Sequence, residues 1–197
     1  MGGMNTGFQM RGSWIMKSIL RWLRTPPVDG PASTFWLRLM CGGVFLWEGI
    51  LKFVYTNQGV GRFTKLGFPW PGPTADFVAV LEIVGGALLV LGLGTRFTAV
   101  PFMIEMVVAM LSTKISLFLG TSPLPLPPVP PQVGIWAVLH EVRSEYAQLL
   151  TTLFLFLAGP GRWSLDALMS RRLVVRAATR VPAAPIARTR QLEALSR

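Results

Sequence analysis

Mainly apolar residues form four stretches in this chain, over residues 35–55, 75–94, 97–119 and 145–159. A helix needs about 20 apolar residues to cross a bilayer, and the first three stretches reach that length. The fourth is short unless residues 141–148 extend it as helix. The pattern therefore predicts an all-α fold, an integral membrane four-helix bundle.

Amphipathic segments flank these stretches. In residues 13–24 the apolar side chains share one helical face and the basic side chains share the other, which is typical of a helix lying in the membrane interface. After Gly159-Pro160-Gly161, Ser164 can cap a second helix of this kind. We expect an N-terminal segment with an interfacial helix (1–32), the bundle (33–160) and a basic, partly disordered tail (161–197).

The composition agrees with a membrane protein. Charged residues make up 14% of the chain, against about a quarter in soluble domains. The net charge of +10 is concentrated in the two terminal segments, so the positive-inside rule predicts cytoplasmic N and C termini. Anionic lipid headgroups account for these basic residues, so we expect the bilayer as a partner and no nucleic acid.

Each apolar stretch nevertheless contains or adjoins ionisable residues. A charge near the bilayer centre costs about 2.5–3.5 kcal/mol on insertion scales, so such a group faces the bundle interior or a wet cavity. These residues are Arg38, Glu48 and Lys52 in the first stretch, Glu82 in the second, Glu105 and Lys114 in the third, and Glu145 at the start of the fourth.

Helical wheels and a rise of about 1.5 Å per residue arrange these groups in two layers. The inner layer is an Arg38–Glu105 ion pair, which we interpret mainly as structural. The outer layer is a cluster that opens toward the outer surface, with Glu141 and His140 at its mouth. Its members are Glu48, Lys52, Glu82 and Glu145, of which Glu48 and Lys52, four residues apart, can pair directly.

The outer layer has the composition of a proton-coupled or polar-ligand site. Burial and neighbouring like charge both oppose ionisation, so at least one glutamate is expected to hold a proton near neutral pH. We assign proton handling, the catalytic role, to Glu48, Glu82 and Glu145. Substrate binding is assigned to Lys52, Arg38, Glu105 and His140. The alternative is that all these charges only stabilise a small bundle.

The cysteine and histidine content limits the redox and metal chemistry that this chain can perform alone. Cys41 is the one cysteine, so thiol chemistry would need a partner. The sequence has no His/Cys cluster of the kind that binds a metal ion. We expect no intrinsic cofactor, with a quinone as the candidate ligand and with electrons supplied by a substrate or a partner.

The two longer loops differ in character. Residues 56–73 are expected to form an outer loop, followed by a helix that starts after Pro73 with Thr74 as its cap. Residues 120–133 contain six prolines, which excludes helix and central strand. We expect this segment to be a semi-rigid extended outer loop, and loop 120–140 to be a candidate contact for a protein partner.

Several segments also resemble the DoxX family of four-helix membrane proteins. They are LRLMCGGVFLWEGILKF (37–53), FTKLGFPWPGP (63–73), LEIVGGALLVLGLGTR (81–96), Glu145-Tyr146-Ala147 and GPGRWSLD (159–166). The resemblance implies a multi-pass protein of the bacterial plasma (inner) membrane that is tied to redox chemistry. It maps family positions onto Arg38, Gly42, Gly49, Lys52, Gly67, Glu82, Gly85, Gly86, Glu145, Gly161 and Asp166. The chain departs from the family in having Lys114 or a neighbour where many members carry a histidine late in the third helix, and in its long Pro-rich loop.

Two functions fit this sequence. The first is a redox-linked subunit that binds a quinone or a small sulfur or thiol compound in the outer polar cavity and works with a partner; as an enzyme it would be a quinone-linked oxidoreductase subunit. The second is a non-catalytic accessory or assembly subunit of a larger membrane complex. A small transporter fits less well, since four spans without a clear repeat are few for alternating access. The sequence does not decide between enzyme and accessory subunit.

Overall fold

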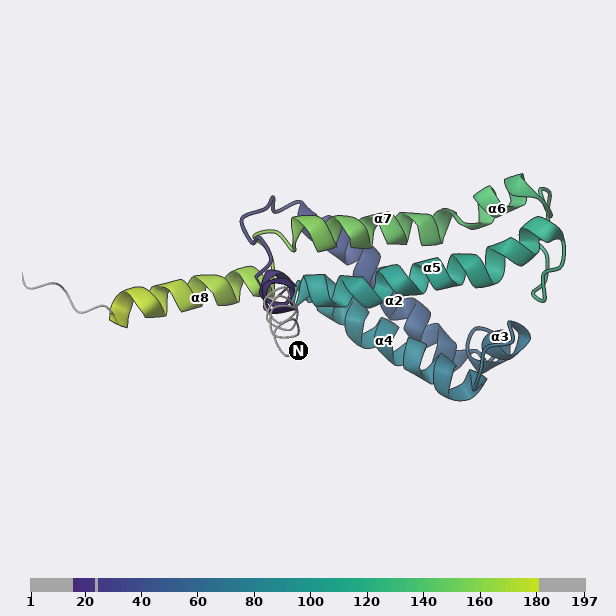
Figure 1. The fold of residues 1–197 in the computed structure, drawn as a ribbon, viewed down its shortest axis with the longest axis horizontal. Coiled ribbons are helices and arrows are strands. Elements are labelled where there is room, and N and C mark those ends of the chain that lie inside the picture. Colours follow the sequence, from purple (N-terminus) through teal and green to yellow (C-terminus); the bar gives the residue numbers. More distant parts are fainter. Residues whose placement is uncertain (1–15, 24, 181–197) are drawn as a thin grey trace, which may run out of the picture.

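The computed structural model describes residues 16–23 and 25–180, and its regular elements in that part are helices. Figure 1 shows the long helices of the bundle side by side, with the last helix leaving from the end where the N-terminal helix lies. A short helix covers residues 16–23. The others are α2 (Thr34–Val54), α3 (Val60–Lys65), α4 (Pro71–Leu91), α5 (Thr95–Leu119), α6 (Ile135–Glu141), α7 (Arg143–Ala158) and α8 (Leu165–Arg180).

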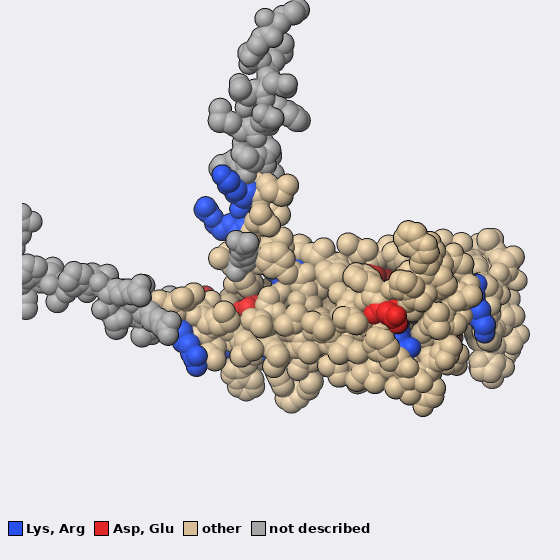
Figure 2. Space-filling model, turned by 90° about the horizontal axis from the view of Figure 1, so that it is seen from below, with Lys and Arg blue, Asp and Glu red and all other residues tan. Residues whose placement is uncertain are grey.

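The surface of the bundle suits a lipid environment. Helices α4 and α5 are long and apolar enough to cross a membrane. Helix α2 is 21 residues long, like α4, but it contains three charged residues. Helix α7 is shorter, with 16 residues. Figure 2 shows a helical body covered mostly by uncharged side chains, with isolated acidic and basic groups on it.

Helices α2 and α4 touch through glycines. A Cβ atom on Gly42 would lie 2.6 Å from the carbonyl oxygen of Gly86, and a Cβ atom on Gly86 would lie 2.6 Å from that of Gly42. One on Gly49 would lie 2.7 Å from the carbonyl oxygen of Ala79. Small residues allow membrane helices to approach with their backbones in contact, so α2 and α4 form one close pair.

Helices α5 and α7 form the second pair, and a small hydrophobic core joins this pair to the pair of α2 and α4. The rings of Phe45 and Phe102 stack with centroids 3.8 Å apart, and Gln148 Nε2 donates to the carbonyl oxygen of Cys41 at 3.2 Å. Helices α4 and α5 touch near their shared turn and then diverge (Figure 1). The core residues are Cys41, Phe45, Leu89, Phe102, Met106 and Leu155.

Arg96 ties three segments together at the α8 end of the bundle. Its side chain donates to the carbonyl oxygens of Trp22 (2.7 Å), Phe156 (2.9 Å) and Leu157 (3.1 Å). Its guanidinium also lies 3.6 Å from the centroid of a Trp22 ring. The residue is only 4% exposed. These contacts fix the helix at 16–23 and the end of α7 against α5.

The segments outside the bundle agree with expectation only in part. Residues 121–134 contain neither helix nor strand, and Ser164 caps α8 by accepting from the backbone N–H of Ala167 at 3.1 Å. The expected loop 56–73 instead contains α3, and α4 begins at Pro71, where Thr74 Oγ1 donates to the Pro69 carbonyl oxygen at 2.8 Å. Of the tail predicted over 161–197, residues 181–197 lie outside the described residues.

Arg96→Lys should destabilise the protein by about 2–4 kcal/mol, because one ammonium cannot replace three guanidinium hydrogen bonds in a planar fork. Denaturant titration in mild detergent measures the change. Arg171→Lys, at an exposed position of α8, is the matched control and should be neutral. Equal losses in the two variants would contradict the role given to Arg96.

Gly42→Ala should cost about 1–3 kcal/mol, because the added methyl group meets the backbone of α4 and forces the helices apart. Gly72→Ala is the control, since a Cβ atom there meets nothing within 4 Å and α4 continues through it. The thermal unfolding midpoint in detergent should fall for the first variant only. An unchanged midpoint in Gly42→Ala would show that the helices are not in backbone contact.

Candidate functional site

The two helix pairs enclose a cavity of about 710 Å³. We call it the interhelical cavity; its walls come from α2, α3, α4, α5 and α7. Most of the lining side chains are apolar, and several of them, such as Phe77 and Ile104, are also widely exposed on the outside of the bundle. The charged residues in its walls are Glu48, Lys52, Arg62, Glu82, Glu105 and Glu145.

A buried ion pair crosses from α2 to α4 in the wall of this cavity. Lys52 Nζ lies 2.5 Å from Glu82 Oε2, and the two side chains are 13% and 4% exposed. The glycine contact explains the proximity, since a Cβ atom on Gly49 would lie 2.9 Å from Glu82 Cβ. The close approach of the two backbones thus brings lysine and glutamate together.

A second carboxyl group joins the pair from α5. Glu105 lines the same cavity as Lys52 and Glu82, and its Oε2 is buried without a hydrogen-bond partner among the described residues. The charge of Glu48, in the same cavity wall, also acts on Glu82. We call Lys52, Glu82 and Glu105 the buried centre; it sets two carboxyl groups against one ammonium.

The predicted Arg38–Glu105 ion pair is wrong. Arg38, 1% exposed, donates through Nη2 to the carbonyl oxygen of Trp163 and packs against Gly92. Arg38 is the fifth residue of α2 and Glu105 the eleventh of α5, a difference in depth of about 9 Å. The two residues therefore lie at different levels of the bundle, and Arg38 is not part of the cavity.

The charge of Asp166 acts favourably on Arg38. Its carboxylate accepts from the backbone N–H of Gly94 at 3.0 Å and of Thr95 at 3.4 Å. Asp166 thereby satisfies free N–H groups at the start of α5, where a negative charge is favourable. These residues form a structural clasp at the α8 end of the bundle.

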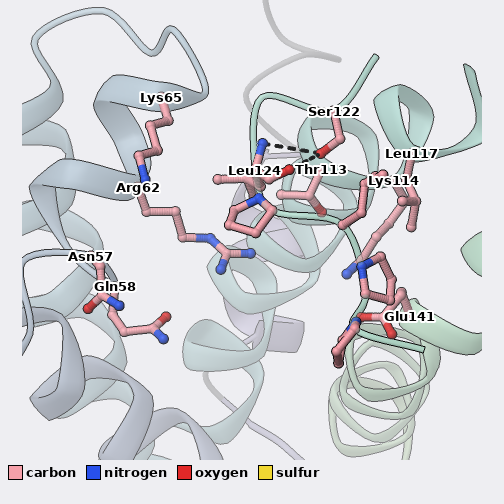
Figure 3. Close-up of a pocket in the computed structure, with 14 residues that line it drawn as sticks. Asn57, Gln58, Arg62, Lys65, Thr113, Lys114, Leu117, Ser122, Leu124 and Glu141 are labelled. Carbon is pink, nitrogen blue, oxygen red and sulfur yellow. Dashed lines mark hydrogen bonds between the residues drawn. The ribbon is translucent and has the colours of Figure 1, made fainter. Parts of the chain in front are cut away.

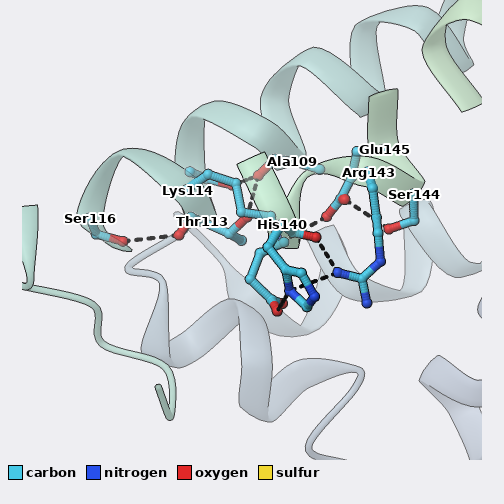
Figure 4. A network of polar contacts seen from close by, with 10 residues as sticks. Ala109, Thr113, Lys114, Ser116, His140, Arg143, Ser144 and Glu145 are labelled. Carbon is cyan, nitrogen blue, oxygen red and sulfur yellow. Dashed lines mark hydrogen bonds and ion pairs between the residues drawn. The ribbon is translucent and has the colours of Figure 1, made fainter. Parts of the chain in front are cut away.

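Glu145 is in the interhelical cavity, as predicted, but its partner differs. Figure 4 shows its carboxylate between two donors: Lys114 Nζ lies 3.2 Å from Oε1, and Ser144 Oγ donates to Oε2 at 2.9 Å. The suggested direct Glu48–Lys52 pair is also wrong, because Lys52 pairs with Glu82. The predicted four-residue cluster is thus split into two ion pairs, with Glu48 in neither.

His140 does not lie where the sequence suggested. It belongs to α6, its side chain is 54% exposed, and it does not line the interhelical cavity. Its Nδ1 lies 3.2 Å from Glu141 Oε1 and 2.8 Å from Arg143 Nη1 (Figure 4). His140 therefore lies on the surface, in a polar group with Glu141 and Arg143, and does not contact the buried centre.

A second cavity of about 400 Å³ lies beside the first, between α3, the end of α5 and residues 122–128. We call it the loop pocket (Figure 3). Three side chains, Gln58, Arg62 and Thr113, line both cavities. Sequence reasoning missed Arg62, although its place beside an aromatic residue in GRFTKLGF was a usable signal for a short amphipathic turn. The charged residues of the loop pocket are Arg62, Lys65, Lys114 and Glu141.

Comparison with known proteins identifies the family. The DoxX family model matches residues 33–115. The "Uncharacterized membrane protein Rv3486" of Mycobacterium tuberculosis is 43% identical over 157 residues, which cover 77% of this chain and 90% of that protein. The chain belongs to the DoxX family. The "Putative oxidoreductase CatD" of Bacillus subtilis is 27% identical over 135 residues, 68% of this chain and 84% of that protein. No solved structure matches the chain.

The DoxX match and the membrane-protein relative make this a membrane protein, in agreement with its apolar surface. The matched segment of this DoxX protein contains Lys52, Glu82 and Glu105, the whole buried centre.

Lys52→Met should destabilise this DoxX protein by about 3–5 kcal/mol, because it leaves two buried carboxyl groups without their cation. Glu82→Gln should cost less, since Glu105 stays near the ammonium. The double variant Lys52→Met, Glu82→Gln should recover part of the loss. Denaturant titration of the four proteins gives the coupling energy.

Lys17→Met, at an exposed position of the N-terminal helix, serves as the control for removing a lysine charge. The assignment of the buried centre fails if Lys52→Met is as stable as this control.

Proposed function

We propose that this DoxX protein is a redox-linked subunit of the bacterial plasma membrane that binds a quinone or a small sulfur or thiol compound in the interhelical cavity. The buried centre carries the proposal. It places one ammonium and two carboxyl groups on the wall of an otherwise mainly apolar cavity. Buried ionisable groups in membrane helices are functional-site candidates by default.

The size and lining of the cavity suit a small ring system. Ligand pockets commonly measure about 300–1,000 Å³ and combine apolar walls with a few polar groups that fix orientation. The ammonium of Lys52 can donate a hydrogen bond to a ligand carbonyl oxygen. The unpartnered Oε2 of Glu105 offers the complementary acceptor for a ligand hydroxyl group.

The charge count suits coupled electron and proton transfer. The buried centre carries one surplus negative charge when both carboxyl groups are ionised, so it can take up one proton and become neutral. Reduction of a quinone to a quinol consumes two electrons and two protons. In our proposal a reduced sulfur compound or a partner protein supplies the two electrons. The buried centre delivers the one proton that it can hold, and the second proton comes from water after Glu105 is protonated again.

Two further observations support a redox role and its orientation. The name of the Bacillus relative, "Putative oxidoreductase CatD", agrees with this chemistry. Basic residues of the described part gather at the α8 end, where Arg162, Arg171 and Arg172 follow the last span. From the positive-inside rule we propose that this end faces the cytoplasm, with both cavities in the outer half of the membrane.

An accessory role is the second candidate, and one observation favours it. Lys52 and Glu82 join α2 to α4, so the pair has a structural use even without a ligand. In that case the protein would hold a larger complex together, with loop 120–140 as the contact for a partner. Ligand binding by a variant that leaves this ion pair intact separates the two functions.

Glu105→Gln is that variant, since it removes a carboxylate but keeps the Lys52–Glu82 pair and the side-chain volume. We expect it to weaken binding of a short-chain ubiquinone analogue, or of a small thiol, about tenfold, equivalent to about 1.4 kcal/mol. Equilibrium binding to the purified protein in mild detergent measures this. Asp76→Asn, exposed near the start of α4, is the control and should bind like the unmodified protein.

Unchanged affinity in a folded Glu105→Gln variant would contradict the site. If neither ligand binds the unmodified protein but a stoichiometric partner copurifies with it, the accessory role replaces the redox role.

A further inference from the structure

Three basic side chains from two separate segments meet at the loop pocket. Arg62 and Lys65 come from α3, and Lys114 comes from α5. Figure 3 shows the guanidinium of Arg62 reaching from α3 into the space that faces Thr113. The pocket also contains neutral donors, the side-chain amides of Asn57 and Gln58, and one carboxylate, Glu141.

The positive charge of this pocket is only partly neutralised. Lys114 is paired with Glu145, whereas Arg62 and Lys65 have no carboxylate within 4.0 Å among the residues that the structure describes. Arg62 is also partly buried, so part of its hydration is lost without a compensating ion pair. A ligand that brings negatively charged oxygens would supply the missing partner.

We propose that the loop pocket binds a phosphate-class oxyanion, with Arg62 as its main donor and Lys65, Lys114 and Gln58 around it. A guanidinium presents parallel N–H groups that match two oxygens of one phosphate. The pocket has room for such a group with its substituent. The proposal uses no residue of the buried centre, so it can be tested separately from the redox function.

Two sources can supply this oxyanion, and the geometry accommodates both. Free phosphate can enter from the aqueous side through the loop pocket. An anionic phospholipid can place its headgroup there and an acyl chain in the interhelical cavity, because Gln58, Arg62 and Thr113 line both spaces. Basic pockets between membrane helices bind acidic headgroups in this way.

The test compares two probes on the full chain. In neutral detergent, the thermal midpoint is followed against inorganic phosphate. In nanodiscs of phosphatidylcholine with or without phosphatidylglycerol, native mass spectrometry counts the phosphatidylglycerol that stays bound. We expect at least one probe to bind, and Arg62→Gln to weaken that binding about tenfold. Arg171→Gln, exposed on α8 at the other end of the bundle, should bind like the unmodified protein.

A response to phosphate alone identifies a free anion, and retention of phosphatidylglycerol alone identifies a lipid headgroup. Lys65→Gln is the second variant, since its exposed position leaves folding intact; it should weaken binding severalfold. The proposal is overturned if neither probe binds, or if Arg62→Gln and Lys65→Gln bind the probe as the unmodified protein does. Because Glu105→Gln leaves this pocket unchanged, failure here and failure of the redox proposal are separate results.

Discussion

A charged side chain in a membrane-length helix has to be stabilised by partners inside the protein. The packing of the helices in this chain depends on the partners that its buried charged residues find. Arg96 and Arg38 bind carbonyl oxygens at the α8 end. Lys52, near the other end of α2, binds the carboxylate of Glu82. That pair exists because Gly49 lets the backbones of α2 and α4 touch.

The same close contact shapes the cavity. With α2 held against α4, and α5 against α7, the two pairs meet at the α8 end and separate toward α3 (Figure 1). The space between them is bounded by apolar residues, but it also receives the carboxyl groups that have no cation of their own. The tightly packed α8 end thus stabilises the bundle, whereas the open end toward α3 leaves space for a ligand.

The positions of the helices could be predicted from the sequence, because lengths near 20 apolar residues leave little choice of element. The inward direction of Lys52, Glu82 and Glu145 was also predictable, since a helical wheel fixes the angle of a side chain. A helical wheel gives neither the depth of a side chain in the bundle nor the residue with which it pairs. Arg38 and Glu105 therefore seemed to match, although their distances from the ends of α2 and α5 differ by about two turns.

The residues that sequence reasoning missed or misplaced belong to short elements. Helix α3 has 6 residues, too few to show a hydrophobic period, so the sequence alone does not mark Arg62 as a site residue. Helix α6 has 7 residues, and its direction decides that His140 faces outward. Both depend on how the chain turns between the long helices, which tertiary packing determines.

The central claim is that a ligand binds between the two helix pairs, against Lys52, Glu82 and Glu105. Photo-crosslinking with a photoreactive short-chain quinone, followed by peptide mass spectrometry, tests it most directly. Our account predicts labels on cavity-lining residues of α2, α4 and α5, such as Phe45, Leu81 and Ala109, and their loss with excess unlabelled quinone. Labels spread over lipid-facing residues such as Trp36, and insensitive to competition, would contradict it.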